Sequence, residues 1–269
     1  MSEPEILVVD DGDAATALAG DRVGAALRDG VEERGRADWA TTGGSSSVGI
    51  YRHLATPAHI QDVPWPSIHV WWGDDRYVPL DHALSNVKPF EDILLDIAGH
   101  EEGTSRGGSA AAVPLPIANV HPFRTTEAIG ASRGAEACAA ELAEELRAAD
   151  LPVVEGWPVF DLVLLGVGAD GHVLSVFPGS AAFESKDWAL AIPAPTHIEP
   201  HVQRVTLNPA VLNVARQLIV VAFGAGKASV LGDVFGAEVD PSRWPAQLAR
   251  REGATWILDR AAAANLPPR

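Results

Sequence analysis

Residues 160–180, FDLVLLGVGADGHVLSVFPGS, decide the fold that this sequence predicts. The apolar run at residues 162–165 is typical of a buried parallel strand, and a glycine-rich turn that carries Asp170 and His172 follows it. In open α/β sheets, functional groups gather at the carboxyl ends of the strands. Imidazole has an ordinary pKa near neutral pH, and a neighbouring carboxylate can orient it. The triplet therefore indicates acid–base chemistry, although an ordinary turn with a solvent-facing His172 stays open on these residues alone.

The same stretch also spells G-x-G-x-x-G, the pattern of a dinucleotide-binding turn, through Gly166, Gly168 and Gly171. In that motif a long helix should begin at the third glycine, but Pro178 soon interrupts any helix here. The next apolar run, at residues 189–192, leads into Pro-Ala-Pro rather than the acid that would bind a ribose. We therefore expect no nicotinamide and no other cofactor.

Away from this stretch, short apolar runs alternate with helical patterns. This alternation predicts an α/β fold, Rossmann-like, with a mainly parallel sheet and helices on both faces. The expected strands are residues 6–9, 39–41, 68–72, 162–165, 189–192, 205–207, 218–223 and 255–258. The expected helices are residues 13–34, 47–54, 85–97, 126–149, 209–213, 227–235 and 260–264.

Composition sets limits on the partners of the protein. The chain has 269 residues, 47% of them hydrophobic, and we expect one domain over residues 1–269. Its formal net charge of −16 argues against nucleic acid and acidic membranes, because both need a basic surface. No apolar run is long enough to span a bilayer. We expect a monomer or a small homo-oligomer.

Several smaller features complete this outline. The acidic N-terminus lacks the pattern of a secretory signal, and the single Cys138 cannot form an internal disulfide, so we expect a cytoplasmic protein. His197 and His201 are four residues apart, but the prolines around them disfavour a helix, and we expect no metal site. Residues 100–112 are polar and glycine-rich, which is typical of a surface loop or a lid.

Residues 42–47, TGGSSS, form a candidate anion-binding loop between a strand and a helix. Gly43 and Gly44 allow close approach of the backbone, while the hydroxyls of Ser45 and Ser46 and the free N–H groups of the helix start can donate to phosphate oxygens. The alternative is a serine-capped helix after a tight turn.

Three cationic side chains stand at other boundaries between elements. Arg76 follows the strand at residues 68–72, in WGDDRYVP, where it can bind phosphate through its planar fork or pair with Asp74 or Asp75. Arg204 and Lys227 lie at the starts of a strand and of a helix. A lysine at a helix start is unfavourable unless an anion binds there, although it can also extend into solvent.

Taken together, these segments resemble the 6-phosphogluconolactonase family. The ordered matches are TGGSSS at 42–47, WWGDDRYVPLDHALSN at 71–86, LLGVGADGHVLSVFPGS at 164–180, RVTLNPAVLN at 204–213, GAGKASVL at 224–231 and TWILDRAAA at 255–263. The resemblance implies hydrolysis of 6-phospho-D-glucono-1,5-lactone in the oxidative pentose phosphate pathway, without a metal. It implies His172 as the base, Asp170 as its positioning group, and substrate contacts from Gly43, Gly44, Ser45, Ser46, Asp74, Arg76, Gly171, Arg204 and Lys227.

The sequence departs from the family pattern at two places. Ser46 and Ser47 replace Thr-Pro in the glycine-serine loop, and Leu174 adds bulk beside the histidine motif. The alternatives are a glucosamine-6-phosphate deaminase and a sugar-phosphate sensor without turnover. The motif around His172 resembles that of the deaminases, but those enzymes have a glutamate where this chain has Phe177. This difference argues against the deaminase. Against the sensor, binding alone does not need a poised histidine.

Overall fold

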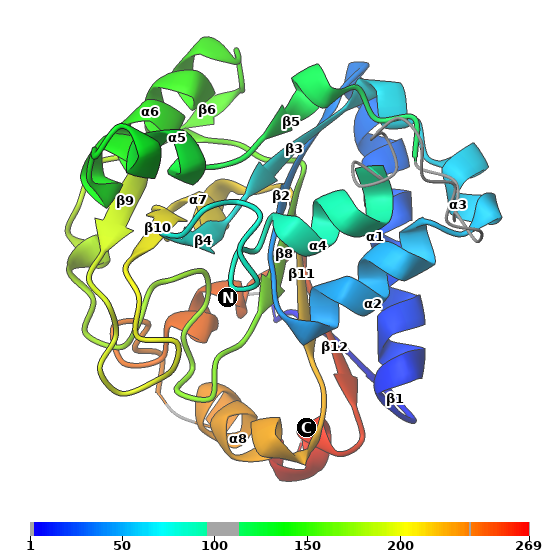
Figure 1. Ribbon diagram of the computed structural model, residues 1–269. Helices are drawn as coiled ribbons and strands as arrows, with labels where there is room; N and C mark the ends of the chain where they lie inside the picture. Colours follow the sequence, from blue (N-terminus) through cyan, green and yellow to red (C-terminus); the bar gives the residue numbers. More distant parts are fainter. Residues whose placement is uncertain (1–2, 96–112, 237, 269) are drawn as a thin grey trace.

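The computed structural model describes residues 3–95, 113–236 and 238–268, with the side chain of Ser45 excepted. A seven-stranded sheet, parallel throughout, forms its centre (Figure 1). The strands lie in the order β1 (Glu5–Val9), β12 (Ala254–Asp259), β11 (Gln217–Ala222), β8 (Leu162–Gly166), β2 (Ala37–Thr41), β3 (Ile68–Trp72) and β5 (Val120–His121). This arrangement confirms the mainly parallel α/β fold.

Helices cover both faces of the sheet (Figure 1). One side carries α1 (Gly12–Arg34), α2 (Ser45–Leu54), α3 (Pro57–Asp62) and α4 (Lys88–Phe90). The other carries α5 (Thr125–Gly130), α6 (Ala135–Ala148) and α7 (Val211–Val214), while α8 (Ala228–Gly236) lies near the C-terminal end of the chain. Among the described residues, no helix is both long and apolar enough to cross a membrane.

The longest helix follows from its sequence. Asp11 caps α1 by accepting a hydrogen bond of 2.9 Å from the N–H of Ala14, and Gly35 ends the helix in a left-handed conformation. Small buried residues such as Ala15, Ala19 and Ala26 let α1 pack closely against the sheet. The predicted start at residue 13 was therefore one residue late.

A small antiparallel sheet contains two of the strands that the sequence predicted. Its order is β4 (Asp74–Arg76), β10 (Arg204–Leu207) and β9 (Ala189–Ile192), so these last two strands lie outside the parallel sheet. The pairing of β10 with β4 sets Arg204 directly opposite Arg76. A further two-stranded hairpin joins β6 (Val153–Val154) to β7 (Trp157–Pro158).

Three of the predicted helices need correction. Residues 126–149 form two helices, α5 and α6, because Ser132 adopts a positive φ of 54° and Gly134 precedes the second helix. In the predicted helix at 85–97, α4 and a π-helical turn, Glu91–Leu95, begin only after the turn at residues 85–87, and residues 96 and 97 lie outside the described part. At residues 260–264 the chain forms a 3₁₀ turn, Ala262–Asn265. The loop predicted at 100–112 also lies outside the described residues.

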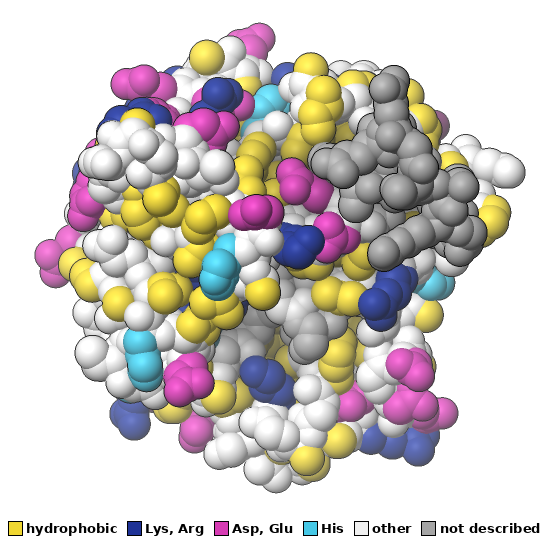
Figure 2. Space-filling model, in the orientation of Figure 1, with side chains coloured by type: hydrophobic (Ala, Val, Ile, Leu, Met, Phe, Trp, Pro, Cys, Tyr) yellow, Lys and Arg dark blue, Asp and Glu magenta, His cyan; other side chains and the backbone are white. Residues whose placement is uncertain are grey.

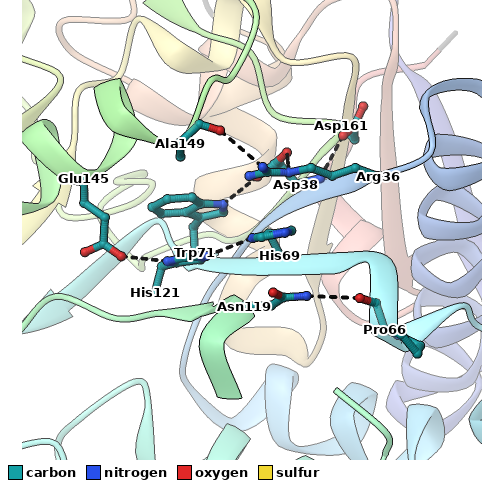
Figure 3. Close-up of polar contacts among 10 residues, drawn as sticks. All are labelled: Arg36, Asp38, Pro66, His69, Trp71, Asn119, His121, Glu145, Ala149 and Asp161. Atoms are coloured by element: carbon teal, nitrogen blue, oxygen red, sulfur yellow. Dashed lines mark hydrogen bonds and ion pairs between the residues drawn. The ribbon is translucent and has the colours of Figure 1, made fainter. Parts of the chain in front are cut away.

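A network of hydrogen bonds centred on Asp38 connects β2 to its neighbours in the sheet (Figure 3). The carboxylate of Asp38 accepts two hydrogen bonds from Arg36, of 2.8 and 2.6 Å, and one of 2.8 Å from the indole N–H of Trp71. The backbone N–H of Asp38 donates to Asp161 over 2.8 Å. Since Asp38 is buried, this set of donors is what makes its charge tolerable there.

The network continues toward the edge of the sheet through His121 (Figure 3). One nitrogen of its ring, Nδ1, lies 2.7 Å from the carboxylate of Glu145 on α6, and the other, Nε2, lies 3.0 Å from Nδ1 of His69. The ring also stacks on Trp71, with 4.0 Å between the ring centres. Burial lowers the pKa of His69 to about 4, with a smaller lowering from the positive charge of Arg36.

The topology creates a crevice between β2 and β8. The chain leaves β2 toward β3 and β5 on one side, and it leaves β8 toward β11 and β12 on the other. The loops that follow β2 and β8 therefore diverge, which opens a space at the carboxyl ends of these strands. Two of the motifs that the sequence singled out, at 42–47 and at 164–180, include the loops that follow these two strands.

Candidate active site

A cavity of about 340 Å³ lies at this crevice. Figure 2 shows that face of the molecule hollowed near its centre, with Lys and Arg side chains at two places beside the hollow. The cavity is lined by Thr42, Gly43, Gly44, Ser46, Asp74, Arg76, Asn86, Gly166, Val167, Gly168, Ala169, His172, Leu174, Ile198, Arg204, Val221, Ala222, Phe223 and Lys227. A larger groove of about 840 Å³ runs along the edge strand β1 and contains none of the predicted site residues.

Contacts with Tyr51 and Asn86 hold the glycine-serine loop at the cavity. The hydroxyl of Tyr51 donates to the carbonyl of Thr42 over 2.5 Å, which ties the loop to α2. A Cβ atom at Gly43 would overlap the side chain of Asn86, so only glycine fits there. Gly44 caps α2 with no side-chain acceptor for the N–H groups of the first turn. The helix start at the cavity is therefore suited to an anion.

His172 and Asp170 form a hydrogen-bonded pair at the end of β8. Nδ1 of His172 lies 2.5 Å from one carboxylate oxygen of Asp170. A carboxylate can only accept, so Nδ1 carries the proton in neutral His172 and Nε2 keeps its lone pair. Within the described part of the chain, Nε2 of His172 has no hydrogen-bond partner, and the residue lines the cavity. This is the arrangement of an oriented general base.

A second imidazole contacts the same carboxylate. Nε2 of His197 lies 2.8 Å from the other oxygen of Asp170, and about half of the His197 side chain is exposed. Sequence reasoning considered His197 only as a metal ligand and missed this contact. No sequence pattern could have predicted this contact, because residues 193–203 have no regular pattern. His197 lies in the connection between β9 and β10, and the path of that connection brings it to Asp170.

The environment of Asp170 favours its ionised form. Partial burial raises its pKa, but the hydrogen bonds from His172 and His197 and the charge of His172 outweigh burial and hold the pKa of Asp170 well below its usual range. A carboxylate this acidic is a poor base. It serves instead to fix the tautomer and orientation of His172.

Arg76 and Arg204 form an unpaired cationic couple. They are register partners on neighbouring antiparallel strands, so their side chains project from the same face. Each donates one hydrogen bond to a carbonyl, Arg76 to Leu84 over 2.8 Å and Arg204 to Pro200 over 3.0 Å. The Nε atoms of both are buried without a partner, and among the described residues neither guanidinium pairs with a carboxylate.

Like charges placed opposite each other are destabilising, and buried donors without partners add to the cost. Burial lowers the pKa of Arg204, and the charge of Arg76 lowers it further. A bound anion would offset the repulsion between the two guanidinium groups. Among the described residues, the alternative that the sequence left open, a salt bridge from Arg76 to Asp74 or Asp75, does not form.

Lys227 supplies a third cation to the cavity. Its ammonium group donates to the carbonyl of Val167 over 2.7 Å, and burial lowers its pKa in spite of the charge of Asp170. In the described structure it has no ion-pair partner. The hydrogen bond to Val167 leaves two of its N–H groups for a ligand.

The two acids after β3 have different tasks. Asp74 lines the cavity, and its carboxylate accepts hydrogen bonds from Ser175 over 2.5 Å and from Asn86 over 3.2 Å. Asp75 is buried behind it and accepts from the backbone N–H groups of Arg76 and Asn86, both at 2.7 Å. Burial raises the pKa of Asp75 to about 7. Asp75 therefore holds the turn at 85–86 rather than a ligand.

Phe177 and Leu174 shape the apolar part of the site. The Phe177 ring lies 4.7 Å from the His172 ring and 5.6 Å from the His197 ring, measured between centres. The phenyl ring of Phe177 thus packs against both imidazoles. Leu174 lines the cavity, so its bulk lies at the site as the sequence predicted. Its backbone has a positive φ of 55°, which is uncommon for a bulky residue.

The structure brings most of the predicted site residues together. Gly43, Gly44, Ser46, Asp74, Arg76, His172, Arg204 and Lys227 line one cavity. Asp170 and Gly171 are not among the lining residues; Asp170 supports His172, and Gly171 forms the turn with a positive φ of 81°. The helix α2 begins at Ser45, whose side chain is outside the described structure.

Comparison with known proteins gives the family of this chain. The family model described as "Glucosamine-6-phosphate isomerases/6-phosphogluconolactonase" matches residues 10–257. The chain is 34% identical to the 6-phosphogluconolactonase of Mycobacterium tuberculosis over 265 residues, covering 97% of this chain and 98% of that protein. It is also 34% identical to the 6-phosphogluconolactonase of Synechocystis sp. over 240 residues, 88% of each chain.

Solved structures give the same result. The 6-phosphogluconolactonase of Trypanosoma brucei superposes with a TM-score of 0.82 and 27% identity, over 99% of this chain and all of that one. A monomeric glucosamine-6-phosphate deaminase, at 14% identity and a TM-score of 0.73, shares the fold alone. This chain therefore belongs to the glucosamine-6-phosphate isomerase/6-phosphogluconolactonase family.

Proposed function

We propose that this protein is a 6-phosphogluconolactonase, which hydrolyses 6-phospho-D-glucono-1,5-lactone to 6-phospho-D-gluconate. One observation carries the proposal: a carboxylate-oriented histidine and two arginines without acidic partners line the same cavity. The first can activate water, and the second can bind a phosphate group. The names of the relatives, at 34% identity over most of the chain, support the same reaction.

The 6-phosphate binds between Arg76 and Arg204, and its oxygens accept from the terminal N–H groups that Leu84 and Pro200 do not use. Lys227 contributes a further donor, and the start of α2 with Ser45 and Ser46 completes the set of phosphate ligands. Hydrogen bonds of this charged kind are worth about 1.5–3 kcal/mol each. Asp74, the acid among the lining residues, faces this cationic group and accepts from a sugar hydroxyl.

His172 acts as the general base. Its Nε2 takes a proton from water, and the oxygen of that water attacks the lactone carbonyl carbon. Backbone N–H groups around Gly44 or in the turn at residues 168–171 stabilise the oxyanion. Within that turn, Gly168 and Gly171 already donate their own N–H groups to backbone carbonyls. The bond to the ring oxygen then breaks, and the imidazolium returns its proton to that oxygen. Asp170 holds the ring in place throughout, with His197 on its other oxygen.

The competing functions fit the site less well. A deaminase of this family would have a glutamate at position 177, whereas this chain has Phe177 there, with its ring 4.7 Å from the His172 ring. A sensor without turnover would need the phosphate ligands but not the fixed tautomer of His172. Oriented bases contribute about 10²–10⁴-fold to turnover, which binding does not use.

The wider setting is also part of the proposal. The reaction needs no metal, because His172 activates the water and the substrate is already an activated ester. We place the enzyme in the oxidative pentose phosphate pathway of the cytoplasm, acting as a single domain and as a monomer or small homo-oligomer. One connected hydrophobic core among the described residues supports the single domain.

The test is an assay with freshly prepared 6-phosphogluconolactone, corrected for spontaneous opening at each pH. The protein should accelerate opening and should release no ammonia from glucosamine 6-phosphate. Ammonia release faster than lactone opening would reverse the assignment. Tight binding of 6-phosphogluconate with no acceleration would establish the sensor instead.

A further inference from the structure

A second cluster of chemically capable side chains lies away from the cavity, where α1, α2 and α3 meet. Asp21 belongs to α1, His53 to the last turn of α2, and His59 to α3. Each offers one ligand atom, and these three atoms lie within 4.8 Å of one another. Figure 1 shows the three helices on the side of the sheet that faces away from the small antiparallel sheet.

Both imidazoles converge on one oxygen. Nε2 of His53 lies 2.8 Å from Oδ1 of Asp21, and Nε2 of His59 lies 3.2 Å from the same atom. Most of each ring is covered, with 26% of the His53 side chain and 13% of the His59 side chain exposed. The carboxylate of Asp21 is the open side of the cluster, with 61% exposed.

The tautomer of His59 is fixed by Thr56. The hydroxyl of Thr56 donates its single hydrogen to the carbonyl of His53 over 2.8 Å. The contact of 3.1 Å between that hydroxyl oxygen and Nδ1 of His59 must therefore be donated by Nδ1. In neutral His59 this leaves a lone pair on Nε2, which faces the carboxylate oxygen of Asp21. Two acceptors facing each other repel unless a proton or a metal cation lies between them.

Two glycines of α1 make room for the rings. Gly20 and Gly24 lie one helical turn apart on either side of Asp21. A Cβ atom at Gly20 would overlap the ring of His53, and one at Gly24 would lie 3.1 Å from the ring of His59. Glycine inside a helix costs about 0.5–1 kcal/mol relative to alanine. Because these two positions carry no side chain, both imidazole rings can lie against the backbone of α1 beside Asp21.

We propose that Asp21, His53 and His59 bind a divalent transition-metal ion, and that Zn²⁺ is the ion bound under physiological conditions. Two imidazole nitrogens and one carboxylate oxygen are a common zinc ligand set, and water completes the tetrahedron at the exposed side. The hydrogen bond from Nδ1 of His59 to Thr56 is the outer contact that metal-bound histidines usually make.

The ion would add a link between helices that packing, the Arg28–Asp62 ion pair and the Asp21–His53 contact already hold together. It would link α1 to the C-terminal end of α2 and to α3, while the N-terminal end of α2 carries the glycine-serine loop of the cavity. The ligands are outside the set of residues that lines the cavity. Metal binding is therefore expected to raise thermal stability and to leave the chemical step unchanged.

The experiment titrates metal-free protein with Zn²⁺ by calorimetry at pH 7.5, in the parent and in His53→Gln, His59→Gln and Asp21→Asn. His82→Gln, at an exposed histidine outside the cluster, is the matched control. We expect one Zn²⁺ per chain in the parent and in the control, with binding weakened at least about tenfold in each cluster variant. Saturating Zn²⁺ should raise Tm in the parent and in the control only.

A parent that binds no Zn²⁺, or cluster variants that bind it as tightly as the parent, would overturn the proposal. Binding at Asp170, His172 and His197 instead would be recognised by its loss in His172→Asn and by competition with 6-phosphogluconate. Gly20→Ala gives a test that keeps every ligand, because its Cβ must displace the ring of His53. Anomalous diffraction at the zinc edge should then locate the ion between Asp21, His53 and His59 in the parent.

Discussion

Arg36 differs from the pair Arg76 and Arg204 in whether a carboxylate of the protein neutralises its charge. Arg36 makes two hydrogen bonds to Asp38 and one of 3.2 Å to the carbonyl of Ala149 (Figure 3). Arg76 and Arg204 face each other, each with a single carbonyl partner and a buried Nε that has none. The first site is complete without a ligand, whereas the second is complete only when an anion binds.

The histidines repeat this contrast. His121 uses both ring nitrogens, one toward Glu145 and the other toward His69. His172 uses Nδ1 toward Asp170, and among the described residues its Nε2 has no partner. A histidine beside a carboxylate is thus not in itself a catalytic pair. The unused nitrogen at a cavity separates the residue that reacts from the one that holds the fold.

The largest expected effect is on kcat, and it distinguishes His172 from His121. His172→Asn should lower kcat by about 10²–10⁴-fold, because asparagine cannot act as a base, and Tm should stay near that of the parent. His121→Asn should do the opposite, lowering Tm while leaving kcat/KM near the parent value. Steady-state kinetics and thermal unfolding of both variants give the answer. A fully active His172→Asn protein would move the search for the base to Asp74 and Asp170.

The next effect separates the arginines. Arg204→Met should lower kcat/KM by about tenfold to over a hundredfold, the equivalent of one or two charged hydrogen bonds. Arg36→Met should instead lower Tm, because it leaves buried Asp38 without its cation. Inhibition by 6-phosphogluconate should weaken in Arg204→Met alone. If Arg204→Met binds this product as tightly as the parent does, the arginine couple is structural.

A smaller effect concerns pH and the network at His69. Its pKa is lowered to about 4 in the folded protein, from an ordinary value near 6.5. The folded state thus binds fewer protons than the unfolded state, so this contribution to stability is complete above about pH 6.5 and is lost as the pH falls toward 4. In His69→Gln, Tm should fall less between pH 7 and pH 4.5 than it does in the parent.

Comparing the two proteins isolates His69 from Asp75, whose raised pKa acts in the opposite direction over part of the same range. Identical pH dependence of Tm in both proteins would show that His69 is not held neutral by the fold. The kcat/KM ratio of the two proteins should not change with pH, because His69 is not among the residues lining the cavity.

The smallest expected effect is that of a chelator on activity. Treatment with EDTA should leave kcat/KM unchanged, because His172, Asp170 and the three cations of the cavity suffice for the proposed reaction. The measurement is the lactone assay before and after dialysis against EDTA, with Tm recorded in parallel. A loss of turnover that a divalent ion restores would contradict the metal-free mechanism, whereas a lower Tm alone would agree with an ion at His53 and His59.

Local patterns in the sequence determined most of the central sheet. Six of the seven strands of that sheet were predicted, because each contains a short run of mostly apolar residues. The β5 strand was missed, since two residues, Val120–His121, carry no pattern of their own. Residues 126–149 were wrongly predicted as one helix, because the positive φ of Ser132 has no signal in its residue type.

Motifs at strand ends also predicted most of the candidate site residues that line the cavity. Tertiary structure decided which of those groups act together. The pairing of β10 with β4 sets Arg204 against Arg76, and the loop before β10 brings His197 to Asp170, 27 residues away. The cluster of Asp21, His53 and His59 arises in the same way from three helices. Contacts between residues distant in the chain depend on packing and register, which no local pattern records.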